Sequence, residues 1–332
     1  MANNLNIVVK LTTNCPANCK CCTNRQREFV SKNEKNRIFD IITFEKICVK
    51  VKAIGGTYIC LSGGEPTIVA NIDEYMEIAQ KHGLATRMNT TGWGITEEKL
   101  RRWLSLGLEQ VVLSVYSLDK DRIKSIRGNG VLLKKLLNAA ELIKKMKLEN
   151  HPFLFIVQTV VMSENYRELP DILEFAIENK ADTVWPSYME DAVNLPEIRM
   201  EKNDIKILKN EIIPQMKKLI ERYPFSEDHK ACMKKSLSNY YADEFDDFIY
   251  HREDFDCHWL GKHFTFYPNG TVYPCPGHEY FSSECQYTID YSSIDDFLTL
   301  ENLANNATSK TEHCKYCPQG IFEEVKIEQY SS

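Results

Sequence analysis

The stretch NIVVKLTTNCPANCKCC, residues 6–22, decides the fold of this 332-residue chain. It begins with a short apolar run, residues 6–11, of the kind that forms a buried strand. Three cysteines follow at CxxxCxxC spacing, namely Cys15, Cys19 and Cys22. Ordinary [4Fe–4S] clusters are held by four cysteine thiolates. Three thiolates placed directly after a strand therefore predict a cluster in which one iron stays free of protein and can bind a ligand.

Outward from this stretch, short apolar runs alternate with amphipathic segments as far as about residue 186, which is typical of repeated βα units. Strands are predicted at residues 6–11, 57–61, 84–89, 110–115, 152–160 and 183–185. Helices are predicted at residues 71–82, 96–106 and 131–147, where apolar side chains recur at helical spacing. The pattern predicts an α/β fold, a partial TIM-like (β/α)6 barrel whose active residues lie at the carboxyl ends of the strands.

The composition excludes several classes of protein. Hydrophobic residues make up 43% and charged residues 27%, as in ordinary globular proteins, and the formal net charge of −6 argues against a nucleic-acid binder. The first residues lack the regions of a signal peptide, and the longest apolar runs are too short to span a membrane. We therefore expect a cytoplasmic protein whose twelve cysteines ligate metal rather than form disulfides.

Polar motifs follow the next predicted strands. Gly63-Gly64-Glu65-Pro66 comes after the second strand, where glycines let the backbone approach a ligand closely and a carboxylate can accept hydrogen bonds from an ammonium group. Asn89 begins a polar turn, Asn-Thr-Thr-Gly, at the end of the third strand. A plain Gly-Pro turn and a helix-leading loop are the alternative interpretations of these two motifs.

The fourth predicted strand ends in the sequence SVYS, whose first residue is Ser114. Asp119 follows it, and Ile126-Arg127-Gly128 lies a little further along the chain. A guanidinium such as that of Arg127 suits bidentate pairing with a carboxylate. An ordinary solvated arginine is the alternative interpretation.

The cysteine motif, the GGEP motif and the SxD…RG pattern together resemble the radical S-adenosylmethionine (SAM) superfamily, along most of the chain. The resemblance implies that the open iron chelates the amino and carboxylate groups of SAM. Reductive cleavage of SAM would then give methionine and a 5′-deoxyadenosyl radical, which abstracts a hydrogen atom from the substrate. It also implies that Ser114 bonds SAM and that Arg127 pairs with its carboxylate. The cofactor-binding residues implied are Gly63, Gly64, Glu65, Pro66, Asn89, Ser114 and Arg127. A zinc knuckle or a reduced cytosolic cysteine cluster is the alternative for the three cysteines.

Cys21 departs from the family pattern, which usually places an aromatic residue before the third cysteine. Cys21 could ligate in place of Cys22 if the loop shifted. We prefer Cys22 because it keeps the family spacing, which leaves Cys21 as a small packing residue. Cys48 and Cys60 lie in apolar stretches and are expected to be buried packing residues as well.

Four further cysteines surround a predicted β-hairpin near the end of the chain. Cys257 and Cys275 flank it, its FTFYPNGTVYPC sequence contains an Asn-Gly turn, and Cys314 and Cys317 form a later CxxC. This layout resembles the SPASM domain in its truncated form, called twitch. The resemblance implies an auxiliary [4Fe–4S] cluster with four thiolate ligands, no free iron and a role in electron transfer. A zinc site with four cysteine ligands is the alternative.

Three regions are expected: a barrel at residues 1–187, a helical linker at 188–256 and the twitch domain at 257–332. The linker is interpreted as a solvated helical connection, with a substrate clamp as the alternative. It contains Cys232, and in the radical SAM peptide epimerases a cysteine returns a hydrogen atom to the opposite face of a Cα radical. Cys232 is therefore a candidate hydrogen-atom donor, with an ordinary helix cysteine as the alternative. Cys285 has no predicted role.

The main functional hypothesis is modification of a ribosomally made peptide, by epimerisation or crosslinking, with a flavodoxin or ferredoxin as one-electron reductant. It follows from the SPASM-type layout, which is common among peptide modifiers. Many of these begin with a winged peptide-recognition domain, which is not expected here, so a leader peptide would be bound elsewhere or by a separate partner. The first alternative is a dehydrogenase of a sugar or aminocyclitol alcohol. The second is a zinc-stabilised, non-catalytic binding protein.

Overall fold

The computed structural model describes residues 5–22, 38–188, 198–223, 226–238, 262–275 and 287–288. The strands are β1 (Asn6–Thr12), β2 (Tyr58–Gly63), β3 (Ala85–Thr90), β4 (Leu108–Ser114), β5 (Leu154–Val161), β6 (Thr183–Tyr188), β7 (His263–Phe266), β8 (Thr271–Tyr273) and β9 (Tyr287–Thr288). They form one sheet in the order β6-β5-β4-β3-β2-β1-β7-β8-β9. Neighbours from β6 through β1 to β7 are parallel, whereas the β7–β8 and β8–β9 pairs are antiparallel.

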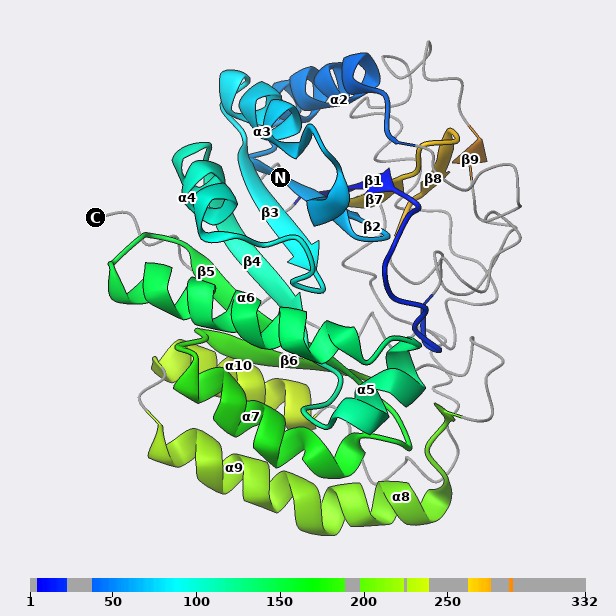
Figure 1. The fold of residues 1–332 in the computed structure, drawn as a ribbon, viewed down its shortest axis with the longest axis vertical. Coiled ribbons are helices and arrows are strands. Elements are labelled where there is room, and N and C mark those ends of the chain that lie inside the picture. Colours follow the sequence, from blue (N-terminus) through cyan, green and yellow to red (C-terminus); the bar gives the residue numbers. More distant parts are fainter. Residues whose placement is uncertain are drawn as a thin grey trace.

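Helices follow the parallel strands, as the sequence predicts. They are α2 (Ile41–Ala53), α3 (Ile72–Lys81), α4 (Glu97–Ser105), α5 (Lys120–Arg127), α6 (Val131–Leu148), α7 (Leu169–Glu178), α8 (Lys202–Ile207), α9 (Ile213–Arg222) and α10 (Glu227–Ser238). In Figure 1 they succeed one another along the sheet from α2 at the top through α3, α4 and α6 to α7 below. The six predicted barrel strands are confirmed, each to within three residues. The predicted partial α/β barrel is therefore confirmed.

Local signals explain where the helices begin and end. The hydroxyl of Thr96 accepts a hydrogen bond of 3.3 Å from the backbone N–H of Lys99, which makes Thr96 the N-cap of α4. Gly83 follows α3 with φ of +69°, a left-handed conformation that costs glycine little. Asp119 caps α5, and Gly128, again with φ of +69°, ends it.

The two faces of the barrel strands differ. Along β1, the side chains of Ile7, Val9 and Leu11 are fully buried and belong to the main apolar core beneath the helices. Burying each such side chain contributes about 1.5–3 kcal/mol. Because side chains alternate across a strand, Lys10 lies on the opposite, inner face, where it is half-buried. The inner face therefore carries the polar side chains that a binding site needs.

The predicted C-terminal hairpin is confirmed and extends the barrel sheet. Strand β7 pairs with β1 in parallel, with Asn6 opposite His263, and the two side chains meet at 3.0 Å between the Asn6 amide nitrogen and Nδ1 of the imidazole. Phe264 and Phe266 are fully buried in the same core as the barrel helices. The turn ends at Gly270, whose φ is +89°. The hairpin, expected in a separate region, thus shares the core of the barrel.

The described part of residues 188–256 is helical. Helix α9 packs against α7, and α10 packs against β6 at the far edge of the barrel. Cys232 lies in α10, but its side chain is outside what the structure describes. Cys257, Cys285, Cys314 and Cys317 also lie outside the described residues. Among the helices that the structure describes, none combines the length and the apolar character needed to cross a membrane.

Candidate active site

The carboxyl ends of β1 and β2 bring the cysteine motif and the GGEP motif together. The backbone N–H of Gly64 donates a hydrogen bond of 2.6 Å to the carbonyl of Thr12, and that of Glu65 donates one of 2.8 Å to the carbonyl of Asn14. The two motifs, about fifty residues apart in the sequence, thus form one backbone unit. Cys15 follows this unit directly.

The glycines of the GGEP motif allow this close approach. A Cβ added to Gly64 would lie 2.0 Å from the carbonyl oxygen of Asn14, and one added to Gly63 would lie 2.5 Å from that of Thr12. Gly63 also has φ of +134°, which L side chains rarely adopt. The sequence predicts that these glycines make room for a ligand. In the structure their nearest neighbour is the backbone that leads to Cys15.

Glu65 is fully buried, and its carboxylate is occupied by the protein itself. One oxygen accepts hydrogen bonds from the backbone and hydroxyl of Thr67, at 3.1 and 2.6 Å, and from the hydroxyl of Thr90 at 2.6 Å. The other accepts one of 2.6 Å from the backbone of Thr91. We predicted that this carboxylate accepts from an ammonium group of a ligand. The structure shows that it ties the end of β2 to the end of β3. Pro66, also buried, follows it.

Arg127 is 1% exposed and lies beside the cysteine loop. It donates a hydrogen bond of 3.0 Å to the carbonyl of Ser114, and its guanidinium carbon lies 4.7 Å from the centre of the Tyr116 ring. Burial lowers the pKa of Arg127, but the charges of Cys19 and Tyr116 and a hydrogen bond with Cys19 outweigh it, so the pKa is raised. Its Nε atom is buried without a hydrogen-bond partner. Such an orphaned donor suits an anionic ligand next to the cysteines.

The cysteine loop rests on the end of α5. The backbone N–H of Asn18 donates a hydrogen bond of 2.8 Å to the carbonyl of Arg127, and that of Lys20 donates one of 2.9 Å to the carbonyl of Ile126. The ammonium of Lys20 forms a 2.6 Å ion pair with Glu164 and a 3.1 Å hydrogen bond with the hydroxyl of Ser125. These contacts with α5 and Glu164 fix the position of the loop.

The three predicted cluster ligands lie in this loop with different exposure: Cys15 is exposed, Cys19 buried and Cys22 half-buried. Although the Cys15 residue is exposed, desolvation of its thiol raises its pKa to about 12, and the charges of Glu65 and Cys19 add to the shift. Within the described residues, no three His, Cys, Asp or Glu side chains converge on a single metal ion. A cubane cluster binds each thiolate through a different iron, so its ligands need not converge. The loop thus offers three thiol ligands, as a cluster with one open iron requires.

Cys21 is a buried residue of the cysteine loop. It is 6% exposed and packs in a small apolar cluster with Cys19, Ile126, Met162 and Ile198. Burial raises its pKa, and the charges of Cys19 and Cys22 raise it further. These contacts support its interpretation as a packing residue. Cys48 and Cys60 are buried as well, as predicted.

Asn89 and Ser114 lie near the same end of the sheet. Asn89 faces the inside of the barrel, because its neighbour Met88 packs in the outer core and side chains alternate. Ser114 is the last residue of β4, and both residues are half-buried. The structure therefore brings all the predicted SAM-binding positions to the carboxyl ends of β1 to β4 or to the end of α5.

Some site residues are missed by the sequence analysis. Thr67 and Thr90 carry no motif of their own, and only the geometry shows that they fix Glu65. Glu164 is 144 residues from its partner Lys20, so no local pattern connects the two. In the sequence, the only sign of this contact is the charge of Lys20 inside the cysteine motif, which calls for a carboxylate nearby.

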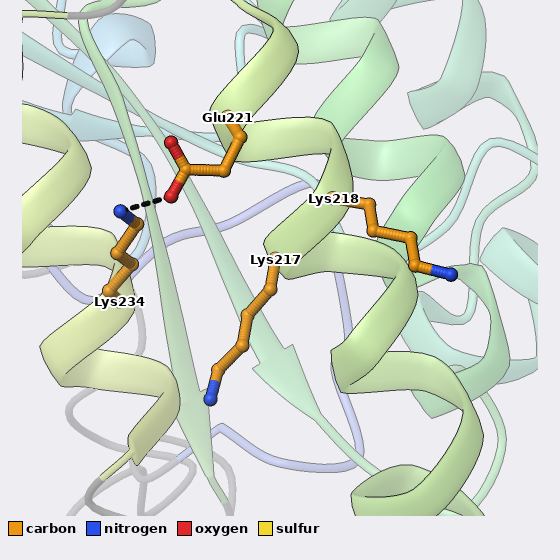
Figure 2. A pocket seen from close by; sticks show the side chains of 4 residues that line it. All are labelled: Lys217, Lys218, Glu221 and Lys234. Atoms are coloured by element: carbon orange, nitrogen blue, oxygen red, sulfur yellow. Dashed lines mark ion pairs between the residues drawn. The ribbon is translucent and has the colours of Figure 1, made fainter.

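A pocket of about 370 Å³ lies between α9 and α10, lined by Lys217, Lys218, Glu221 and Lys234. Figure 2 shows that Lys234 reaches Glu221, with which it forms an ion pair, while the side chain of Lys218 points away from that pair. These helices lie beyond the β6 edge of the barrel. The pocket is therefore separate from the candidate active site at the ends of β1 to β4.

Comparison with known proteins agrees with this geometry. The family model for the radical SAM superfamily matches residues 9–176, which is 168 of the 332 residues. The crystal structure of Streptococcus suis SuiB bound to precursor peptide SuiA has a TM-score of 0.64 and 16% identity, covering 97% of this chain and 71% of SuiB. Native anSMEcpe with bound AdoMet and Cp18Cys peptide has a TM-score of 0.63 and 18% identity, covering 94% of this chain and 86% of that one. At these identities the two structures establish the shared fold.

Proposed function

The chain belongs to the radical SAM superfamily, and on that premise we propose that it modifies a ribosomally made peptide by epimerisation or crosslinking. Membership makes it an enzyme that uses SAM and a [4Fe–4S] cluster. The observation that carries the peptide proposal is the likeness, over nearly the whole chain, to SuiB in complex with a precursor peptide. The likeness to anSMEcpe, also in complex with a peptide, supports it.

Each residue of the site has a proposed role. Cys15, Cys19 and Cys22 hold the cluster. When bound, the cluster and SAM supply an electron and a 5′-deoxyadenosyl radical that abstracts a hydrogen atom. Arg127 offers its unpartnered Nε to the carboxylate of SAM and compensates the negative charge of the buried Cys19. Ser114 and Asn89 bind SAM with polar side chains. In the GGEP motif, Gly63 and Gly64 allow the turn to pack closely on the backbone that leads to Cys15, while Glu65 and Pro66 keep this turn fixed.

The auxiliary site is proposed at Cys257, Cys275, Cys314 and Cys317, of which the structure describes Cys275. Tyr273 pairs with Thr265, which pairs with Val8, so the antiparallel β8 runs toward the amino end of β1. Cys275 follows β8 and is buried. Cys15 follows the opposite end of β1, a strand of seven residues that spans roughly 20 Å. This separation supports a role in electron transfer rather than in contact with the reacting atoms.

Cys232 remains the proposed hydrogen-atom donor for epimerisation: its S–H bond would break as the new Cα–H bond forms, and the thiyl radical would regain one electron from the one-electron reductant and a proton from solvent. Epimerisation is redox-neutral for the product, and the hydrogen delivered by a thiol exchanges with solvent. The product made in D2O would then carry deuterium at the inverted carbon. Deuterium incorporation that persists in Cys232→Ala would show that another group is the donor.

Metal content and SAM cleavage test the proposal. Anaerobically prepared protein is expected to hold about eight irons, falling to about four in the Cys15/Cys19/Cys22→Ala variant. With dithionite, the wild type is expected to release 5′-deoxyadenosine and the variant none. About four irons with one zinc would make the C-terminal site structural. Oxidation of a sugar alcohol, with no change in any peptide, would favour the dehydrogenase alternative. Membership of this enzyme superfamily already argues against a non-catalytic binding protein.

A further inference from the structure

The corner between α5 and α6 is the protein surface next to the cysteine loop. A Cβ added at Gly128, which ends α5, would lie 3.1 Å from the Cβ of Asn18. The side-chain amide of Asn129 donates a hydrogen bond of 3.2 Å to the carbonyl of Pro16. Asn18 and Pro16 both lie between Cys15 and Cys19. Anything that docks on this corner therefore comes within a few residues of the proposed cluster.

Three exposed lysines surround this corner, and we call them the lysine face. Lys120 and Lys124 lie four residues apart on α5, hence on one side of the helix. A Cβ built on Gly130 would contact both, at 3.6 Å from the Cβ of Lys124 and 3.8 Å from the Cγ of Lys120. Lys134 is exposed on α6, one turn after Val131.

The lysine face is accessible, and its ammonium groups are not held in ion pairs. None of its three lysines forms an ion pair within the part of the chain that the structure describes. Asp121 is also exposed on α5, three residues before Lys124 and hence on the same side of the helix, but it forms no ion pair with Lys124. Val131, a large apolar residue, is 55% exposed in the middle of the corner. A small apolar contact ringed by like charges is typical of a transient protein interface.

We propose that the lysine face docks an acidic one-electron carrier protein that reduces the cluster. The inference rests on the proposed function, because it requires a cluster at Cys15, Cys19 and Cys22. One electron leaves the reduced flavin or iron–sulfur centre of the carrier and enters the oxidised cluster, and no bond forms or breaks. The enzyme carries a formal net charge of −6, so its net charge opposes the approach of an acidic carrier. A local group of cations then orients the carrier toward the cluster.

The test compares two charge-reversal variants with equal change in net charge. The first is Lys120→Glu/Lys124→Glu/Lys134→Glu. The control is Lys46→Glu/Lys180→Glu/Lys218→Glu, three exposed lysines on α2, after α7 and on α9. Binding of a bacterial flavodoxin, an acidic FMN protein, is measured by anaerobic calorimetry at low and high ionic strength. 5′-Deoxyadenosine formation is measured in parallel with reduced flavodoxin and with dithionite, which needs no docking site.

The first variant is expected to bind flavodoxin about tenfold more weakly or worse at low ionic strength, with little further loss at high ionic strength. Its flavodoxin-driven rate falls accordingly, while its dithionite-driven rate equals that of the wild type. The control retains wild-type binding. Unchanged binding in the first variant, or an equal loss in the control, would overturn the docking site. Absence of dithionite-driven SAM cleavage in the wild type would instead refute the proposed function, and the binding data would still decide the docking surface.

Discussion

The buried carboxylate of Glu65 and the hydroxyl of Thr90, 25 residues apart in the sequence, are joined by a hydrogen bond of 2.6 Å. Together with Thr67 and Thr91, this bond links the carboxyl ends of two neighbouring strands beneath the cysteine loop. The GGEP motif of this chain thus has a structural role, which is to link neighbouring strand ends. Its glycines hold the turn against the backbone after β1, and its carboxylate ties the same turn to the end of β3.

Replacing Glu65 by Gln is expected to lower the free energy of unfolding by about 2 kcal/mol. The glutamine amide replaces one acceptor oxygen by an NH2 group, which would face the backbone N–H of Thr91 or the hydroxyl of Thr90. At least one buried donor then has no acceptor. Glu98→Gln, an exposed change on α4, is the matched control and should be neutral. Chemical denaturation measures both. Equal stability of the two variants would mean that the carboxylate does not tie the strands.

Gly64→Ala is expected to lose more than about half of the iron at the N-terminal site. The new Cβ would overlap the carbonyl of Asn14 at 2.0 Å, so the backbone before Cys15 has to move. Gly130→Ala is the control, because a Cβ there meets its nearest neighbour at 3.6 Å. Iron content after anaerobic reconstitution is measured in the Cys257/Cys275→Ala background, which removes two proposed auxiliary ligands. Full iron loading in Gly64→Ala would contradict the close packing.

Arg127→Lys is expected to weaken SAM binding at least tenfold, about 1.4 kcal/mol, because lysine cannot reproduce the planar fork of the guanidinium. Decarboxylated SAM, which lacks the carboxylate, should bind the variant and the wild type equally. Calorimetry on reconstituted protein gives both affinities. An equal loss for the two ligands would show that Arg127 supports the site without touching the carboxylate.

The ion pair between Lys20 and Glu164 is expected to make stability depend on pH. Burial raises the pKa of Glu164, but hydrogen bonds from Lys20 and Ser125 outweigh it and the pKa is lowered. A carboxylate whose pKa is lowered on folding adds stability above its unfolded pKa, about 4.3, and that stability is lost as the pH falls through the folded pKa. A double-mutant cycle with Lys20→Met and Glu164→Gln should give about 1 kcal/mol of coupling at pH 6. The coupling should vanish well below pH 4. Coupling that persists there would rule out an ionic origin.

Phe266→Ala is expected to destabilise the whole barrel by about 3–5 kcal/mol, because the ring is fully buried in the shared core. Ile42→Ala, on an exposed side chain of α2, is the control and should cost little. Thermal unfolding followed by circular dichroism measures both. Two separate transitions, with the barrel transition unmoved, would mean that the hairpin folds as an independent unit.

The barrel and its motifs could be predicted because their signals are local. Short apolar runs predict the strands, and segments with helical spacing between them predict the helices. The functional motifs follow the strand ends within a few residues. The cap at Thr96 and the left-handed Gly83 are equally local. Each of these features depends on residues that lie within one turn or one strand of each other.

The remaining features depend on partners that are distant in the sequence. The threonines around Glu65 come from two strand ends, and Lys20 meets Glu164 across 144 residues. The pairing of β7 with β1 was not predicted either, because a hairpin sequence shows that its own strands pair but not which edge they join. The polar contact that joins Asn6 to His263 spans 257 residues.

That last span has a consequence for the synthesis of the chain. β1, which carries the cysteine loop, is synthesised before its neighbour on one side, β7, which emerges from the ribosome some 257 residues later. At typical translation rates this delay lasts roughly 10–50 s. During that time one edge of β1 has no strand partner, which is the condition under which sheets pair wrongly. The chain therefore has to keep this edge of β1 from pairing with other chains until β7 has been made.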